Sequence, residues 1–139
     1  MPRSSHITPT ANQLEYYSDI ADNFLKHPLT GDLVRTTNED AVARSIRHIL
    51  LTDRGEWPFR PALGSDIRKA LFQPFGPFLV EDLQTAIREA VKVHEPRAEI
   101  VSLTIYDAQA DGGIGINLLF TVINDTTVYK LNVILTRER

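Results

Sequence analysis

Histidine is the residue type whose ordinary pKa best suits metal binding or acid–base chemistry near neutral pH. The chain has four: His6, His27, His48 and His94. No two of them stand four positions apart, the spacing that places two imidazoles on one helix face, and no HExxH motif is present. The chain also has no cysteine, which excludes Cys-ligated zinc, iron–sulfur clusters and a thiol nucleophile. We therefore interpret the histidines as surface or helix-end residues and expect no metal or other cofactor.

Motifs for nucleophilic catalysis and phosphate binding are also missing. None of the serines stands in a GxSxG nucleophile elbow. The run Gly112-Gly113-Ile114-Gly115 is rich in glycine, but it links two predicted strands, so no helix N-terminus follows it to bind an anion. A hairpin turn explains this run better than a phosphate site does.

Paired carboxylates are the one catalytic arrangement that the sequence leaves open. Eighteen Asp and Glu residues offer many pairs that could serve as the acid and base of a glycosidase. Most of them lie on predicted outer helix faces, in helix caps or in turns, where solvation or capping accounts for them. A carboxyl group that stays protonated near neutral pH needs an apolar pocket, and no such pocket is identified. A glycosidase-type hydrolase is therefore an alternative function, with no catalytic residue assigned.

Glu95-Pro96-Arg97 is the most informative short segment, because it places opposite charges on either side of a rigid residue. One interpretation is a plain helix stop whose charges are solvated or pair with each other, an arrangement that contributes about 0–1 kcal/mol when it is exposed. The other interpretation is an interaction corner, in which Glu95 orients Arg97 and the guanidinium offers a planar fork to a partner. Arg97→Ala should then leave the thermal midpoint nearly unchanged, because the pair is expected to be exposed, and should abolish binding of the partner. The residue chemistry alone favours neither.

Length and charge limit the classes of protein to which these residues belong. The 139 residues suit one domain, since a domain usually takes roughly 100–200 residues. The net charge of −3 is evenly spread and argues against a protein that binds nucleic acid or an anionic membrane. No apolar stretch approaches the roughly 18 residues of a membrane span, and the polar N-terminus has no signal-peptide core. We expect a soluble intracellular domain over residues 14–139, preceded by a flexible arm at 1–13.

The first strong helix is predicted to begin at Thr37 or Asn38, either of which can cap it, and to end before Gly55. Before it, a turn at His27–Asp32 is expected to separate two short extended segments. The apolar stripe of this helix repeats at i, i+4, i+7 and i+8, and its members are Val42, Ile46, Ile49 and Leu50.

The segment Asp53–Asp66 is predicted to be a loop that packs across the core. Trp57, Phe59 and Leu63 are too apolar to be expected in solvent. Because a buried aromatic ring is costly to remove, Phe59→Ala is expected to cost about 3–5 kcal/mol if this loop is part of the core.

Two further helices and three strands complete the predicted elements. A short helix runs from Ser65 or Asp66 to about Phe72, and a second strong helix runs from about Phe78 to His94 and is stopped by Pro96. The apolar stripe of the strong helix comprises Val80, Leu83, Ile87, Ala90 and His94, widened by Leu79 and Val91. The strands alternate in the regions Ile100–Tyr106, Ile114–Ile123 and Val128–Thr136. Two amphipathic helices on one face of a three-stranded antiparallel meander, with short N-terminal strands, define an α+β fold.

The chain resembles the gene-25-like (GPW/25-like) baseplate wedge proteins of contractile phage tails, whose relatives include the lysozyme-like-named baseplate subunit of type VI secretion systems. The resemblance spans roughly residue 18 to the C-terminus. It rests on several short motifs in the expected order: Thr37-Asn38-Glu39-Asp40-Ala41-Val42, Ser45-Ile46-Arg47, Leu50-Leu51-Thr52, Arg54-Gly55-Glu56, Phe59-Arg60-Pro61, Leu63-Gly64-Ser65-Asp66-Ile67, Leu71-Phe72 and Glu95-Pro96-Arg97.

This resemblance implies assembly and no catalysis. Proteins of the family lie in the inner baseplate beside the tail tube or hub and initiate the sheath, and their fold is similar to the strand-exchanging part of a sheath subunit. It also implies that Glu95, Pro96 and Arg97 dock on the helical core bundle of other wedge proteins, in a virion tail assembled in the host cytoplasm. A tail-associated peptidoglycan hydrolase and a small intracellular adaptor with the same fold are the alternatives.

A three-stranded meander leaves two strand edges with unpaired backbone groups. The segment from Val128 to Leu135 contains no proline and a single charged residue, Lys130. An edge with so little protection is either an aggregation hazard or a docking site for an added strand. Together with the family resemblance, this pattern predicts that sheath subunits donate a strand here, at Val128, Lys130, Asn132 and Ile134. The alternative without a docking role is that the segment around Ile20–Leu25 covers the edge.

Overall fold

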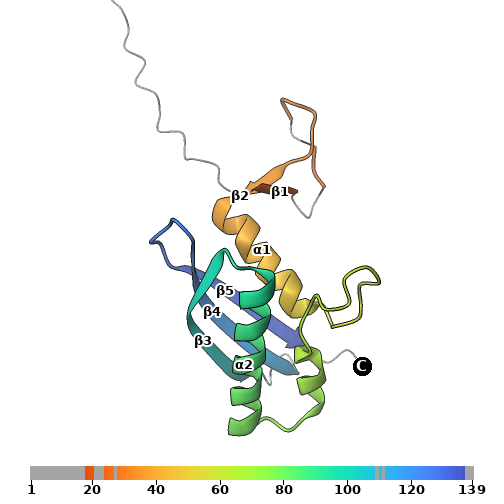
Figure 1. Ribbon diagram of the computed structural model, residues 1–139, viewed down its shortest axis with the longest axis vertical. Coiled ribbons are helices and arrows are strands. Elements are labelled where there is room, and N and C mark those ends of the chain that lie inside the picture. The colour runs from red at the N-terminus through yellow and green to blue at the C-terminus, as the bar shows by residue number, and fades with distance from the viewer. Residues whose placement is uncertain (1–17, 21–23, 27, 109, 111, 137–139) are drawn as a thin grey trace, which may run out of the picture.

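Figure 1 shows a computed structural model of the chain, which describes residues 18–20, 24–26, 28–108, 110 and 112–136. The elements in chain order are β1 (Ser18–Ile20), β2 (Arg35–Thr37), α1 (Asn38–Leu51), the 3-10 helix η1 (Ile67–Phe72), α2 (Pro77–His94), β3 (Ala98–Ala108), β4 (Gly113–Val122) and β5 (Tyr129–Thr136). The predicted α+β class is therefore confirmed. The predicted arm at 1–13 lies outside the described residues.

The strands β3, β4 and β5 form an antiparallel meander with β4 in the centre. Side chains alternate across a strand, and the helix-facing residues of β4 are all buried, as predicted: Ile114, Ile116, Leu118, Phe120 and Val122. In β5 the same alternation buries Val133 and Leu135 and exposes Lys130, Asn132 and Ile134. The sheet therefore has one apolar face and one open face.

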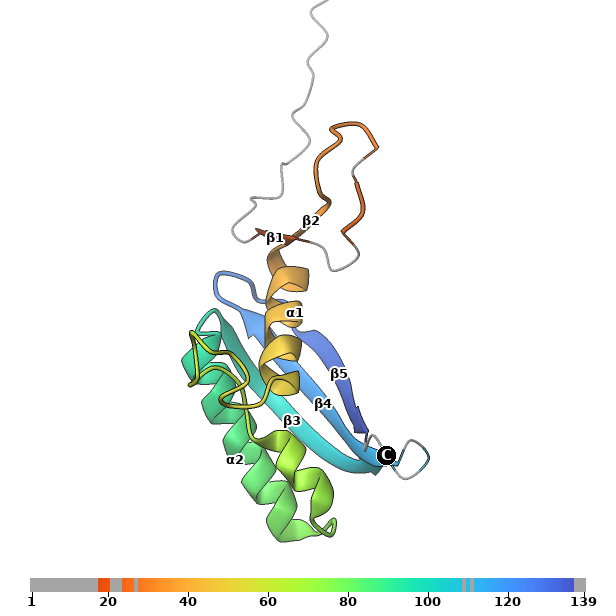
Figure 2. The same ribbon diagram turned by 90° about the vertical axis from the view of Figure 1, so that its right-hand side faces the viewer.

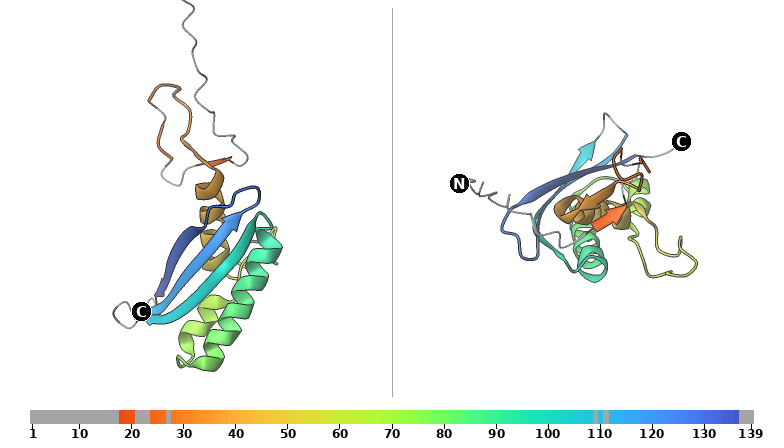
Figure 3. Two further views of the ribbon diagram at one scale, coloured as in Figure 1. Left: turned by 90° about the vertical axis from the view of Figure 1, so that its left-hand side faces the viewer. Right: turned by 90° about the horizontal axis from the view of Figure 1, so that it is seen from above.

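The helices α1 and α2 pack together on the apolar face, whereas no described helix covers the opposite face (Figures 2 and 3). The predicted stripe of α1 is fully buried. In α2 the buried residues are Leu79, Leu83, Ile87, Ala90 and Val91. The other two predicted members of that stripe, Val80 and His94, are half-buried. Among the described residues, no helix has both the length and the apolar character that crossing a membrane requires.

β3 contains an irregularity that the sequence pattern did not predict. Its pairing register with β4 shifts between Ile100 and Ser102, so Val101 is an extra residue. A bulge of this kind reverses the alternation beyond it. Ile100 therefore lies on the helix-facing side with Leu103, whereas regular alternation placed it on the side of Tyr106.

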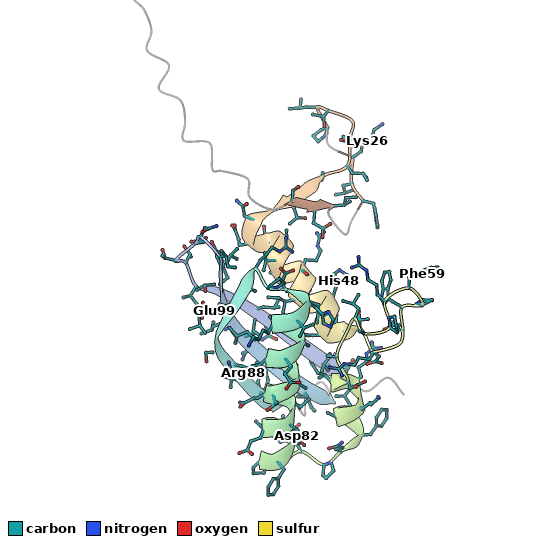
Figure 4. All side chains as sticks on the ribbon, viewed as in Figure 1. Lys26, His48, Phe59, Asp82, Arg88 and Glu99 are labelled. Carbon is teal, nitrogen blue, oxygen red and sulfur yellow. The ribbon has the colours of Figure 1, made fainter. Side chains whose placement is uncertain are left out.

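The loop between α1 and η1 does not pack across the core. Phe59 is 97% exposed and Trp57 is 55% exposed, and Figure 4 shows Phe59 on a loop that projects away from the helices. The loop is held by its own backbone, since the Gly55 N–H donates to the Pro61 carbonyl at 2.9 Å and a second backbone bond of 2.9 Å joins its two ends. The prediction that this loop packs across the core with Trp57 or Phe59 as its anchor is therefore wrong, and the large cost of Phe59→Ala, expected only for a core position, does not apply.

The N-terminal strands form a small sheet of their own beyond the start of α1 (Figure 1). β1 and β2 pair antiparallel, and a bridge between Lys26 and Leu33 closes the predicted turn. The Val34 N–H donates to the Leu25 carbonyl at 2.9 Å. No described residue of this segment pairs with β5, so the alternative in which Ile20–Leu25 covers that edge finds no support among the described residues.

Candidate interaction surfaces

The corner after α2, which consists of Glu95, Pro96 and Arg97, is connected by backbone hydrogen bonds to α2, to β3 and to the end of β4. The Glu95 N–H donates to the Val91 carbonyl of α2 at 2.8 Å, and the Ala98 N–H at the start of β3 donates to the Glu95 carbonyl at 3.1 Å. The Arg97 carbonyl accepts from the N–H of Ile123, just past β4, at 2.9 Å. These backbone bonds alone fix the path of the chain through the corner.

The Glu95 side chain is buried, with the residue only 1% exposed. Its two oxygens accept hydrogen bonds from Arg97, one from Nε at 2.5 Å and one from Nη2 at 2.6 Å. Ser45 of α1 makes a further side-chain hydrogen bond to this carboxylate. Burial raises the pKa of the Glu95 carboxyl, but the bonds from Arg97 and Ser45 outweigh that effect and hold the pKa below its usual value. Glu95 is therefore ionised at the margin of the core.

Arg97 reaches from this buried carboxylate toward the surface. Its side chain is 37% exposed, against 2% for the side chain of Glu95, and Pro96 between them is exposed. A bidentate pair fixes the plane of a guanidinium group, so Glu95 orients Arg97, and this pairing fits both interpretations of the segment. In this conformation a docking partner can touch Pro96 and Arg97. The buried Glu95 affects docking only because it orients Arg97. That such a partner docks here stays a prediction.

The burial of Glu95 corrects one expectation from the sequence. The small effect predicted for Arg97→Ala assumed that the pair is solvated on both sides, as exposed pairs are. In the structure Glu95 is buried. Removing the Arg97 guanidinium leaves the Glu95 carboxylate buried without its main balancing charge, which destabilises the fold. Arg97 is therefore a residue of the fold as well as a candidate contact.

The edge of β5 is the second candidate surface. In an antiparallel ladder, residues bonded to the neighbouring strand alternate with residues whose N–H and C=O point away from it. Asn132 lies opposite Asn117 of β4, and its carbonyl accepts a hydrogen bond from Arg47 Nη2 at 3.3 Å, on the side away from β4. Every second residue of β5, from Lys130 to Thr136, therefore turns its backbone outward.

β3, the other edge of the sheet, is less suited to adding a strand. Its bulge at Val101 interrupts the regular ladder, which is a common way to blunt an edge. Gln84 of α2 also donates to the Leu103 carbonyl at 3.4 Å. On β5 the corresponding side-chain contact is that of Arg47, which an added strand would have to displace.

The structure places the predicted docking residues as follows. Lys130, Asn132 and Ile134 lie on β5 with exposed side chains on the open face of the sheet, and Val128 precedes the strand and is 51% exposed. The predicted strand therefore begins one residue later than expected. No described strand pairs with this outer edge.

Two functional candidates, Ser45 and Arg47, were missed by reasoning from single residues. Both lie off the apolar stripe of α1, and the sequence carries no signal that one meets Glu95 and the other meets β5. Their partners lie 50 and 85 residues away in the sequence, so only the packing of α1 reveals them.

The histidines gather at no site within the described part of the chain. His48 lies on α1 and His94 at the end of α2, whereas His6 and His27 lie outside the described residues. Among the residues described, no three His, Asp or Glu side chains are grouped as metal ligands.

Comparison with known proteins gives matches over most of the chain. The chain is 28% identical to baseplate wedge protein gp25 of Enterobacteria phage T4 over 115 residues, which cover 83% of this chain and 86% of the phage protein. A Geobacter sulfurreducens structure, provisionally named a tail lysozyme, superimposes with a TM-score of 0.70 at 29% identity and covers 76% of this chain and 96% of its own.

A chain of the anti-feeding prophage baseplate superimposes with a TM-score of 0.67 and covers 79% of this chain and 88% of its own. Its identity of 24% means that this likeness shows the fold alone. The sequence model of the family described as "Baseplate wedge protein gp25" matches residues 36–126, from β2 to the turn before β5. Because this match spans more than half of the chain, the protein belongs to the baseplate wedge protein gp25 family.

Proposed function

We propose that this chain is a structural subunit of a contractile-tail baseplate that initiates the sheath by offering the edge of β5 to a sheath strand. The observation that carries the proposal is the regular, outward-facing backbone from Lys130 to Thr136. Such an edge supplies main-chain hydrogen bonds to an extended segment, which is the basis of β-augmentation. The implied likeness of the family to the strand-exchanging part of a sheath subunit supports the same role.

The two candidate surfaces divide the partners between them. Pro96 and Arg97 dock on the helical core bundle of other wedge proteins, and the β5 edge meets sheath subunits. The tail tube or hub proteins are further neighbours in the inner baseplate. In this role the protein is part of the virion tail and is assembled in the host cytoplasm.

Asn132→Pro tests the role of β5. The Asn132 N–H faces away from β4, so proline removes no bond of the existing ladder, and proline is tolerated at such edge positions. The variant should fold and join the baseplate, yet sheath should fail to grow from it when particles are imaged by electron microscopy. Asn132→Ala keeps the N–H and is the matched control, from which sheath should grow normally. Sheath of normal length on Asn132→Pro baseplates would exclude β5 as the initiating edge.

A cell-wall hydrolase is the second candidate, because one relative in structure is named as a tail lysozyme. The general acid of a glycosidase needs a raised pKa. The carboxyl groups with a shifted pKa among the described residues, Asp66, Glu95 and Asp125, are all shifted downward. We therefore propose a non-enzymatic role, and a zymogram on bacterial cell walls should show no clearing. Clearing by the purified chain would favour the hydrolase.

A further inference from the structure

A groove lies at the C-terminal end of β5, between that strand and the ends of α1 and η1. Both α1 and η1 contact β5. We refer to this cavity of about 270 Å³ as the β5 groove. Its lining mixes apolar and polar residues: Leu51 at the end of α1 and Asp53 after it, Arg68, Leu71 and Phe72 of η1, and Ile134, Leu135 and Thr136 of β5.

The position of the β5 groove ties it to the open edge. Ile134 and Thr136 line the groove and belong to the residues whose backbone N–H and C=O face away from β4. An extended segment that bonds to these groups must therefore run along the groove. Because side chains alternate along a strand, every second side chain of that segment points to the side where α1 and η1 lie.

The lining of the groove is suited to a protein side chain. Phe72 of η1 is 81% exposed at the wall of the groove, whereas the Ile134 side chain lies on the open face of the sheet. An exposed aromatic ring at the wall of a groove is suited to packing against an apolar side chain that enters it.

The groove also holds a polar group that lacks a partner. Oδ1 of Asp53 is buried, and it has no hydrogen-bond partner among the described residues. Asp53 lines the same groove, as does the exposed Arg68. A buried acceptor without a donor is costly, and an incoming segment that brings an N–H or a basic side chain would satisfy it.

We infer that the β5 groove binds the sheath segment through a specific side chain as well as through the backbone. The segment packs an apolar side chain against Phe72, on the side of β5 where η1 lies, and it brings a hydrogen-bond donor to Asp53. This inference rests on the proposed function, because it names the chemistry of the strand that pairs with β5. It makes the groove the source of specificity, whereas backbone pairing alone would accept any extended chain.

Phe72→Asp tests the inference, with Phe78→Asp as the matched control. Both phenylalanines are highly exposed, at 81% and 85%, so neither change should alter the thermal midpoint. Phe72 lines the groove, whereas Phe78 is not part of its lining. The probe is the purified sheath subunit of the same particle, and its binding to each full-length variant is measured by biolayer interferometry. Burial of one large apolar side chain predicts binding about ten- to a hundredfold weaker for Phe72→Asp and unchanged binding for Phe78→Asp.

The outcomes separate this inference from the proposed function. If Asn132→Pro abolishes binding and Phe72→Asp binds as the wild type does, the β5 edge is used but the groove inference is overturned. If both variants bind normally, the proposed function fails as well. A wild-type dimer in analytical ultracentrifugation that Phe72→Asp abolishes would assign the groove to a second copy of this chain, and would also overturn the inference.

Discussion

Replacing Arg97 by alanine tests whether charge pairing holds the corner after α2. The change leaves Glu95, which is 1% exposed, with the hydrogen bond from Ser45 as its main remaining side-chain support. Removing one partner of a fully buried pair costs about 3–5 kcal/mol, whereas an exposed pair contributes about 0–1 kcal/mol. Because the Arg97 side chain is 37% exposed, solvent screening places the expected loss between these limits, at about 1–3 kcal/mol.

The loss should depend on pH, with a sign that follows from Glu95. In the wild type its folded-state pKa is lowered, so its stabilising contribution is present above the ordinary Glu pKa of about 4.3 and is lost as the pH falls through the folded-state pKa. In Arg97→Ala burial remains while the strongest compensating bonds are gone, so the folded-state pKa should rise. The variant then gains stability on protonation. The difference between the two proteins should therefore be largest near pH 7 and should shrink toward pH 4.

Urea unfolding followed by circular dichroism at both pH values measures this difference. Arg88→Ala, at an exposed position of α2, is the control and should change the free energy of unfolding by less than about 0.5 kcal/mol. Adding Glu95→Gln to Arg97→Ala removes the bare charge and should restore at least half of the loss. A loss below about 0.5 kcal/mol for Arg97→Ala at pH 7, or the same loss at pH 4, would refute the reasoning.

The Glu95→Gln/Arg97→Ala double variant also tests docking on the wedge proteins. It lacks the guanidinium fork, yet it carries no uncompensated buried carboxylate, so it should fold. A desolvated arginine at an interface often contributes about 2 kcal/mol or more. Binding to the other wedge proteins in a pull-down should therefore be lost. Retained binding by the folded variant would exclude Arg97 as the docking contact.

Two further predictions concern the loop and the sheet. Phe59→Ala should lower the free energy of unfolding by less than about 1 kcal/mol, because the ring is 97% exposed; a loss of about 3 kcal/mol or more in denaturant unfolding would place Phe59 in the core. Gly115→Ala should cost about 1–3 kcal/mol, because its Cβ would lie 2.1 Å from Cζ of Tyr106. Gly76→Ala, where a Cβ meets nothing within 4 Å, is the control in thermal unfolding, and equal midpoints for the two glycine variants would contradict the close approach.

Much of the fold could be predicted because apolar periodicity matches burial. The stripe of α1 from Val42 to Leu50 and the alternation of β4 from Ile114 to Val122 are both buried as expected. The bulge at Val101 could not be predicted, since no glycine or proline marks it and the sequence around it alternates smoothly. The exposed Phe59 was missed because hydrophobicity predicts burial, whereas this loop is held by its own backbone bonds.

The candidate site was predictable in its residues and less so in its geometry. Opposite charges around Pro96 indicated that Glu95 and Arg97 would pair, and they do. The burial of Glu95 contradicts the ordinary exposure of glutamate, and its hydrogen bond from Ser45 depends on how α1 packs. In the same way, the β5 edge followed from the alternation, but the Arg47 contact and the groove beside it depend on how α1 and η1 pack.

Amide hydrogen exchange along β5, measured with and without the sheath subunit, tests the central claim most directly. In the free chain the outward amides of Lys130 and Ile134 should exchange fast, whereas those of Leu131 and Val133, which face β4, should be protected. Binding of the sheath subunit should slow the outward amides and leave the inward ones unchanged. If the outward amides keep their free-chain rates in the sheath-bound protein, β5 is not the edge on which the sheath begins.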